Sequence, residues 1–439
     1  MMSSANLTER PTLIDSIRDT LKELHLNPYP EVQNPPSCKK RASVALVLRI
    51  RPGYEHAPSP SEDVAPSTST TERLDHFFSQ SWVQHGDPEC VFIKRATRVG
   101  DRWTGHVALP GGKRDPEDEN DKAVAIRETS EEIGLDLNSR HALFIGNLPE
   151  RVVSTSFGRQ PIMVLCPFVW LWTGPDVSPL SLQPGEVAST HWVPLRVLLA
   201  PSARTHEYVD VSDRFAHRGS TFLKAIIRSI LGKMQFSAIR LTPSESLYCS
   251  STAEFFSSPE EKSAAAAKAS LASRFYKWYL GDHAGAAGNN RPLLLWGLTL
   301  GMLADFLDQL PPYNAVELWS YPTFTSWDVR IIIDILTAPL KRRNQARLRN
   351  IGMKNETAID SETEAVSGDN PWFIGGLSKG MEASKKGKNA TRSYAVGILL
   401  EDYYAMARRG VWISAGIRAI ATILFGWFIV RRYWQRVRR

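Results

Sequence analysis

The pattern of apolar and polar positions predicts several strands in the first half of the chain. The apolar runs are rich in β-branched and aliphatic residues and are separated by polar or Pro-containing segments, which is typical of buried strands. The runs are Ala42–Ile50, Cys90–Ala96, Leu143–Leu148 and Ile162–Trp172. We therefore expect a sheet built from these segments.

Helical spacing of apolar residues is found in four other places. Leu13–Leu24 predicts a packing helix, Lys122–Ile133 a short helix, Arg291–Leu310 a strongly amphipathic helix, and Trp327–Leu340 a further amphipathic helix. Strands and helices that alternate along a chain favour an α/β fold.

Two long segments contain few large apolar residues. The stretch from about Pro52 to Glu72 is rich in Pro, Ser and Thr, and Asn344–Thr391 is polar and rich in Gly, Ser and Lys. Such compositions do not bury enough apolar surface to order a chain, so we expect a flexible insertion and a flexible linker.

The last apolar segment, Val411–Val430, is long enough to cross a membrane. Its twenty residues contain Arg418 as the one charge, and a helix of this length matches the ~30 Å hydrocarbon core of a bilayer. A buried helix of a soluble protein is the alternative. Arg408, Arg409 and the aromatic residues near both ends favour a membrane, and Arg418 is tolerable if it snorkels or faces a partner helix.

Composition and charge indicate the cellular compartment and the partners to expect. The 439 residues exceed one average domain, and the net charge of +7 owes much to arginines near the C-terminus, so no nucleic-acid partner is expected. The four cysteines are widely separated and lack zinc-type spacing. No N-terminal secretory core is evident. A reduced compartment is therefore expected.

The candidate chemistry lies in Leu109–Leu135. If the predicted helix forms, Glu128, Glu131 and Glu132 stand at i, i+3 and i+4 and share one face. Three carboxylates packed this closely repel one another unless a cation lies among them, and oxygen ligands suit Mg²⁺ or Mn²⁺. A solvated glutamate-rich face is the simpler alternative. The residues Gly111, Gly112, Lys113 and Arg114 just upstream could approach phosphate oxygens.

This stretch resembles the Nudix box, G-x5-E-x7-R-E-U-x-E-E-x-G-U, in which U is a large apolar residue. Arg127–Leu135 matches its second half, and Glu119 lies at the required distance before Arg127. The loop between Gly112 and Glu119 is one residue longer than in the family, and Thr129 replaces the apolar residue.

The resemblance implies an α/β/α sandwich with a mixed sheet and a metal-dependent diphosphatase that uses Mg²⁺ or Mn²⁺. The substrate class implied is a nucleoside diphosphate linked to another moiety. The residues carried over are Glu128, Glu131 and Glu132 as metal ligands, Glu131, Glu132 and Arg127 as catalytic residues, and Arg102, Gly111, Gly112, Lys113 and Arg114 as substrate-binding residues.

A narrower resemblance is to the coenzyme A diphosphatases, which carry the upstream signature L-L-T-x-[SA]-x3-R-x3-G-x3-F-P-G-G. Gly105–Gly112 is similar to its end, whereas Arg102 lies one residue too close to Gly105 and Leu109 replaces the phenylalanine. Coenzyme A or a derivative is thus the implied substrate. Some Nudix enzymes use a loop glutamate outside the box as general base, which makes Glu186 a candidate, although a solvated surface acid is the commoner case.

The expected organisation follows from these segments. It comprises an N-terminal helix and linker (1–40), a Nudix domain (41–310) with insertions near 52–88 and 201–290, an amphipathic segment (311–343), a flexible linker (344–392) and a C-terminal region (393–439) with a transmembrane helix (411–430). We expect a tail-anchored protein with a cytosolic catalytic domain, in the mitochondrial outer membrane or peroxisome more than the endoplasmic reticulum. A membrane-anchored, non-catalytic Nudix scaffold that binds a nucleotide or a protein is the alternative.

Overall fold

The structure is a computed structural model that describes residues 12–58, 69–96, 103–154, 160–212, 221–249, 292–316, 318–357, 395–400 and 402–438. Arg102, one of the expected substrate-binding residues, lies outside these ranges, as do parts of the expected insertions and most of the expected linker.

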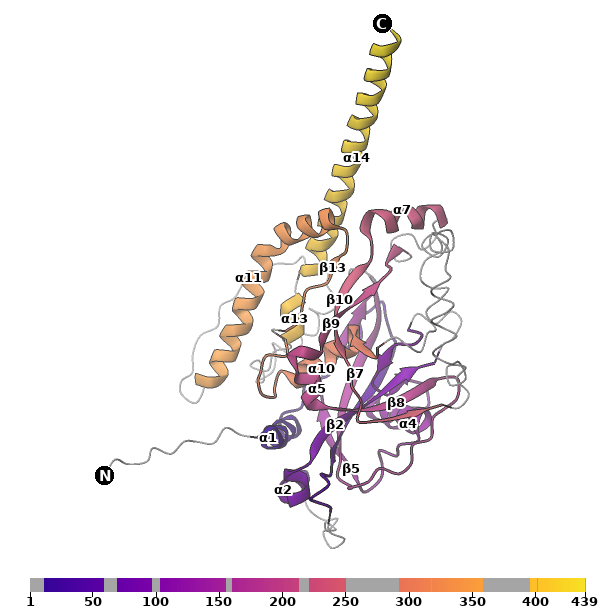
Figure 1. Ribbon diagram of the computed structural model, residues 1–439. Coiled ribbons are helices and arrows are strands. Elements are labelled where there is room, and N and C mark those ends of the chain that lie inside the picture. Colours follow the sequence, from indigo (N-terminus) through magenta and orange to yellow (C-terminus); the bar gives the residue numbers. More distant parts are fainter. Residues whose placement is uncertain are drawn as a thin grey trace, which may run out of the picture.

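A nine-stranded mixed sheet forms the centre of the molecule (Figure 1). The main strand order is β11 (Glu245–Tyr248), β8 (Val187–Pro194), β2 (Asp87–Arg95), β1 (Arg41–Arg51), β7 (Pro161–Trp172) and β5 (Ala142–Asn147). Three short strands complete the sheet: β3 (Val107–Ala108) pairs with β2, β4 (Gly111–Lys113) pairs with β1, and β6 (Arg151–Ser154) pairs with β7. β1 and β7 are parallel, and the other pairs are antiparallel. The four predicted strands are confirmed as β1, β2, β5 and β7.

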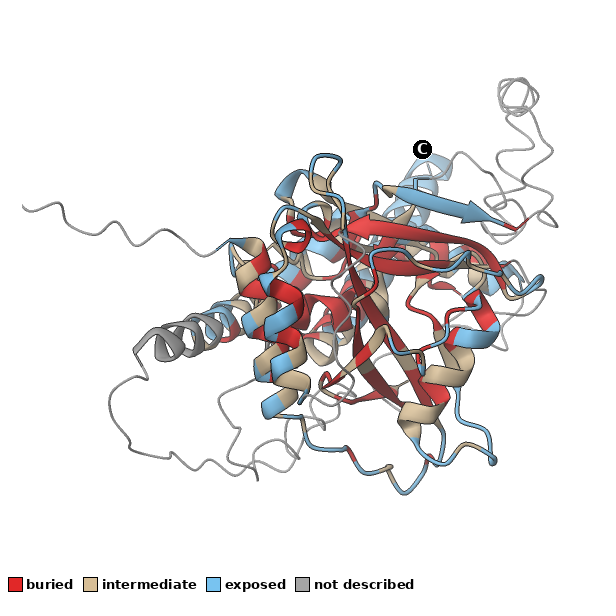
Figure 2. Ribbon diagram, turned by 90° about the horizontal axis from the view of Figure 1, so that it is seen from below, coloured by how far each residue is buried: buried red, intermediate tan, exposed pale blue. Residues whose placement is uncertain are grey.

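The two faces of this sheet are covered by helices. Along β1, Ala45 and Val47 face α4 (Asp121–Ile133), whereas Leu46 and Leu48 face the opposite core, as the two-residue period of a strand requires. The opposite core is completed by α1 (Leu13–Leu26), α2 (Thr70–Ser79), α3 (Ser81–Gln84), α5 (Leu195–Leu199) and α10 (Gly297–Leu307). Figure 2 shows the buried strands between these layers. The expected α/β/α sandwich is therefore confirmed.

The segment Arg291–Leu310 differs from the prediction. Leu294–Trp296 is a strand, β12, and the helix begins only at Gly297. Every residue from Leu300 to Leu307 is buried, so the helix is not amphipathic. The physical reason is its position between two cores: Leu303 and Phe306 pack into the core of the large sheet, while Ala304 packs into a second core.

A second, four-stranded sheet forms a smaller lobe beside the first. It consists of β9 (Arg204–Val209), β10 (Met234–Arg240), β12 and β13 (Thr323–Phe324), after the short turn η2 (Pro201–Ala203). The helices of this lobe are α7 (Thr221–Leu231), α11 (Trp327–Thr357), α13 (Ala395–Leu400) and α14 (Tyr403–Val437). Leu231, Met234, Ile333 and Tyr403 share its core. Residues of the 201–290 segment and of the C-terminal region are thus parts of one packed unit.

Two helices are longer than the sequence pattern predicts. α11 continues to Thr357, past the start of the expected linker at Asn344, whose buried side-chain amide donates to the carbonyl of Leu399. α14 is the one helix among the described residues that is long and apolar enough to cross a membrane. All described residues of α14 beyond Arg418 are exposed, and the helix projects from the body (Figure 1).

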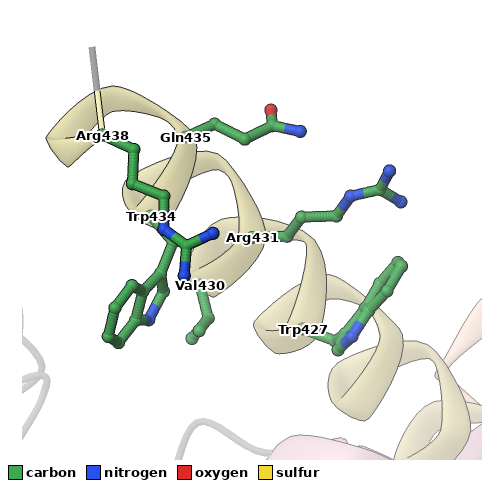
Figure 3. A pocket seen from close by; sticks show the side chains of 6 residues that line it. All are labelled: Trp427, Val430, Arg431, Trp434, Gln435 and Arg438. Carbon is green, nitrogen blue, oxygen red and sulfur yellow. The ribbon is translucent and has the colours of Figure 1, made fainter.

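Arginine and aromatic side chains alternate at the projecting end of α14 (Figure 3). The guanidinium of Arg431 lies 5.2 Å from the ring centre of Trp427, and that of Arg438 lies 5.9 Å from that of Trp434. The shallow hollow that these residues line with Val430 and Gln435 belongs to this helix alone. Such a mixture is typical of the boundary between a membrane and water.

Candidate active site

The helix that bears the three glutamates begins at Asp121, one residue before the predicted start at Lys122, and ends at Ile133 as predicted. The side chain of Asn120 caps the helix by accepting a hydrogen bond from the backbone N–H of Ala123 at 2.9 Å, and Asp121 places negative charge in the first turn. Gly134 ends the helix in the left-handed conformation with φ 71°. α4 packs its Ala125 and Ile133 side chains against the sheet, which fixes the rotation of the helix.

Thr129 shows why this box tolerates a polar residue in an apolar position. The side chain is fully buried, and its hydroxyl donates a hydrogen bond to the carbonyl of Ala125 at 2.7 Å. Since the hydroxyl is satisfied within the helix, Thr129 does not leave an unpaired polar group in the core.

Glu132 is the most buried of the glutamates. The residue is 2% exposed, and one carboxylate oxygen accepts a hydrogen bond from the backbone N–H of Gly111 at 2.8 Å. The pKa of Glu132 is raised to about 8, chiefly by burial; the Gly111 hydrogen bond and Arg95 oppose this shift, and the charges of Glu128 and Glu186 contribute to it. A cation beside this carboxylate would therefore favour its ionised form.

The glycine pair in β4 allows backbone and carboxylates to approach closely. Gly111 has φ 145°, and a β-carbon there would lie 2.2 Å from the carbonyl oxygen of Ser43 in β1. A β-carbon on Gly112 would lie 2.3 Å from the carboxylate carbon of Glu128. The two glycines therefore bring β4 against Glu132 and Glu128.

Arg127 is surrounded by acids. Its Nε and Nη2 donate to the two carboxylate oxygens of Asp118, each at 3.0 Å, and its Nη1 donates to Glu131 at 3.0 Å. Nη2 also donates to the carbonyl of Lys113 at 3.2 Å. The Asp118 carboxylate holds the pKa of Arg127 above its usual range despite desolvation. These bonds make Arg127 a positioning residue that ties the loop to the helix, and its catalytic role stays a prediction.

Glu128 and Glu131 differ in environment although they share a face of α4. The Glu128 side chain is 14% exposed and the Glu131 side chain 51%. Burial raises the pKa of Glu128; the charge and hydrogen bond of Arg127 oppose this shift, and the charges of Glu131 and Glu186 add to it. The charge of Glu186, which precedes β8, acts on both Glu128 and Glu132, and its role as a base stays a prediction.

The two basic residues of the loop are exposed. Arg114 is held by the loop itself, because Nη1 lies 3.3 Å from Asp121 and Nη2 donates to the carbonyls of Asp118 and Glu119. Lys113 is exposed at the end of β4 beside the glycine pair. The substrate-binding roles of these residues stay predictions.

The glutamates of α4 are of the right chemical type for a divalent cation, but no three of their carboxylates have oxygens within 4.8 Å of one another in the described structure. Glu128, Glu131, Glu132 and Glu186 offer carboxylate oxygens, while Arg127 is already paired with Asp118. Burial raises the pKa of both Glu128 and Glu132, and a cation beside them would favour their ionised forms. Hard oxygen ligands are those that Mg²⁺ and Mn²⁺ prefer.

A second acidic cluster lies at the other end of α4 and does not fit a metal. Asp121, Glu150 and Cys166 have ligand atoms within 4.8 Å of one another. The guanidinium of Arg41 already occupies this cluster, at 2.5 Å from Asp121 and 2.8 Å from Glu150, and it donates to Cys166 at 3.2 Å. No local pattern indicates this cluster, since its residues come from distant segments.

A family model described as the NUDIX domain matches residues 82–214, which include the glycine pair, α4 and Glu186. The uncharacterized protein C14C4.10c of Schizosaccharomyces pombe is 30% identical over 314 residues, 71% of this chain and 79% of that protein. The chain belongs to the Nudix family. The resemblance of its box is thereby confirmed.

Two further relatives are named as coenzyme A diphosphatases. The peroxisomal coenzyme A diphosphatase ndx-8 of Caenorhabditis elegans is 37% identical over 115 residues, which are 26% of this chain and 44% of that protein. The mitochondrial coenzyme A diphosphatase NUDT8 of Mus musculus is 41% identical over 56 residues, 13% of this chain and 27% of that protein. The chain therefore spans less than half the length of either diphosphatase.

Proposed function

We propose that this Nudix protein hydrolyses the diphosphate bond of a nucleoside diphosphate linked to another moiety, with coenzyme A or a derivative as the first candidate. The observation that supports this most directly is the approach of Glu132 and Glu128 to the glycine pair. Glu132 accepts the N–H of Gly111, and Gly112 has room only for hydrogen beside Glu128. Two carboxylates and the backbone of the glycine pair therefore meet at one place.

In this proposal Glu128, Glu131 and Glu132 hold Mg²⁺ or Mn²⁺. When bound, the cation neutralises diphosphate oxygens and lowers the pKa of the attacking water. Glu186 accepts a proton from that water at its carboxylate, and Lys113 attracts the anionic substrate. Arg127 and Asp118 hold the loop in place, so that positioning and electrostatics supply most of the rate.

The substrate is tested by incubating the purified full chain with coenzyme A, acyl-coenzyme A, ADP-ribose, dinucleotide cofactors and diphosphoinositols, each with Mg²⁺, Mn²⁺ or a chelator. We expect metal-dependent release of a 5′-nucleotide from at least one substrate: adenosine 3′,5′-bisphosphate from coenzyme A or acyl-coenzyme A, or a nucleoside 5′-monophosphate from ADP-ribose or a dinucleotide. Nucleotide binding without product release in either metal would instead support the non-catalytic scaffold.

The second part of the proposal is that α14 anchors the protein in a membrane. Its exposed apolar surface and its terminal Arg–aromatic pairs support this. The expected tail-anchored topology, with a cytosolic Nudix domain, stays a prediction. The names of the two diphosphatase relatives favour mitochondria or peroxisomes.

Anchoring is tested by carbonate extraction of cell membranes. We expect full-length protein to stay in the pellet and protein lacking Ala419–Arg439 to become soluble. Protease added to intact organelles should digest the Nudix domain, and its protection would contradict the cytosolic topology.

A further inference from the structure

Two helices beside the base of α14 expose apolar stripes. On α7, Phe222, Leu223 and Ile226 are 66%, 44% and 38% exposed. On α11, Trp327, Ile331 and Ile335 recur every four residues and are 75%, 49% and 69% exposed. Side chains four residues apart lie on one face of a helix. Each helix therefore presents a continuous apolar face that other described parts of the protein do not cover.

Arg418 joins these two helices to α14. Its Nε and Nη2 donate to the carboxylate of Asp328 in the first turn of α11, at 2.6 Å and 2.5 Å, and its Nη1 donates to the carbonyl of Ile230 near the end of α7, at 2.8 Å. The hydroxyl of Ser326, just before α11, donates to the same carbonyl at 2.9 Å. The three helices thus meet at one point, and Figure 1 shows α7 and the start of α11 at the end of the body from which α14 leaves.

The length of α14 places this meeting point close to the bilayer. The apolar segment Val411–Val430 matches a hydrocarbon core of ~30 Å. Only its last part, from Ala419 to Val430, is clear of the body, and at ~1.5 Å per residue this part spans roughly 18 Å. The remaining length comes from Val411–Arg418, where α14 lies beside α7 and α11. A bilayer that covers the whole apolar segment therefore reaches the exposed stripes of these helices.

We propose that the exposed faces of α7 (Phe222, Leu223, Ile226) and α11 (Trp327, Ile331, Ile335) form a membrane-docking surface that lies in the lipid interface. This inference rests on the proposed anchoring by α14. Apolar helix faces commonly enter the boundary of headgroups and acyl chains by about 5–10 Å, which accounts for most of the roughly 12 Å of the hydrocarbon core that Ala419–Val430 leaves unmatched.

The Arg418–Asp328 pair supports lipid as the occupant of this surface. A lone arginine is costly in hydrocarbon, whereas Arg418 has a carboxylate and a carbonyl as partners. Docking would also fix the orientation of the Nudix domain, because α14 is packed into the body through Tyr403, Ala407 and Val411. α4 then lies in the half of the body that is farther from α14 (Figure 1).

The experiment uses full-length protein in nanodiscs of phosphatidylcholine and phosphatidylserine. The native cysteines are buried, so single exposed cysteines can be labelled with a thiol-reactive fluorophore. The test positions are F222C and I331C, I423C on α14 reports insertion of the anchor, and L26C at the end of α1 is the matched exposed control. Quenching is measured with lipids that carry a spin label near the headgroup or deep in the acyl chain. Unchanged thermal unfolding midpoints show that the variants fold.

We expect loss of emission at positions 222 and 331 with the shallow quencher, and full emission at position 26. Emission that persists at 222 and 331 while 423 is quenched would overturn the docking surface and leave the anchor intact. Emission that persists at 423 as well would instead contradict the anchoring on which this inference rests.

Discussion

Arg127 donates a hydrogen bond from Nε to one carboxylate oxygen of Asp118 and from Nη2 to the other, each at 3.0 Å. The Asp118 side chain is 6% exposed, and it also accepts the backbone N–H of Asp115 at 2.8 Å. The pair therefore ties the extended loop of this Nudix box to the middle of α4. The additional loop residue is accommodated without loss of that connection.

Arg127→Lys and Asp118→Asn should each destabilise the protein, because lysine lacks the planar fork and asparagine lacks the charge. In a double-mutant cycle we expect a coupling of about 1–2 kcal/mol in the free energy of unfolding, measured by chemical denaturation in detergent. Arg140→Lys, at an exposed arginine, is the control. Additive effects of the two substitutions would contradict the positioning role.

Loss of a carboxylate ligand should abolish most of the proposed activity. Glu128→Gln, Glu131→Gln and Glu132→Gln should each lower kcat by roughly 100-fold or more, as removal of key electrostatic groups does. The amide introduced by Glu132→Gln retains an oxygen that can accept the Gly111 N–H, so we expect the fold to persist by circular dichroism. Glu117→Gln, at an exposed acid of the same loop, should retain activity. An unchanged kcat of Glu132→Gln would contradict the assignment of Glu132 as a metal ligand.

The buried His191 should make the protein less stable in acid. Its ring nitrogens lie 2.9 Å from the hydroxyl of Ser189 and 2.8 Å from that of Ser246, and burial, together with the charge of Lys94, lowers its pKa from 6.5 to about 4. The neutral ring is therefore favoured in the folded state, so stability is complete above about pH 6.5 and is lost as the pH falls toward about 4.

This titration should lower the free energy of unfolding by about 2 kcal/mol between about pH 7.5 and pH 5. Denaturation curves of the wild type and His191→Gln at both pH values measure the difference. The variant should lose less stability in acid than the wild type. Equal losses in the two proteins would show that other groups account for the acid sensitivity.

Breaking the Arg418–Asp328 pair on one side should cost more than replacing both residues. Asp328→Ala leaves the guanidinium without its carboxylate, and we expect a loss of about 1–3 kcal/mol in detergent, reduced by the partial exposure of both side chains. The double variant Arg418→Leu, Asp328→Leu should recover part of this loss, since no unpaired charge remains. The thermal unfolding midpoints of the three proteins provide the test, and a double variant no better than Asp328→Ala would contradict it.

The sequence by itself determined the local elements. The strands β1, β2, β5 and β7 follow from apolar runs rich in β-branched and aliphatic residues, and α4 follows from the helical spacing over Lys122–Ile133. The glutamates of the box fall on one helix because their spacing matches its period. These features depend on residues close in the chain, so they can be read without a structure.

Only the tertiary structure distinguished residues that the sequence makes equivalent. Glu131 and Glu132 are neighbours, yet Glu132 is buried against Gly111 while Glu131 is half-exposed beside Arg127. The second core could not be predicted either, because it joins α7 and β10 to α13 and α14, which lie more than a hundred residues later in the chain. The partner of Arg418 comes from another helix. Burial and ion pairing depend on which distant segments pack together, and no local pattern encodes that choice.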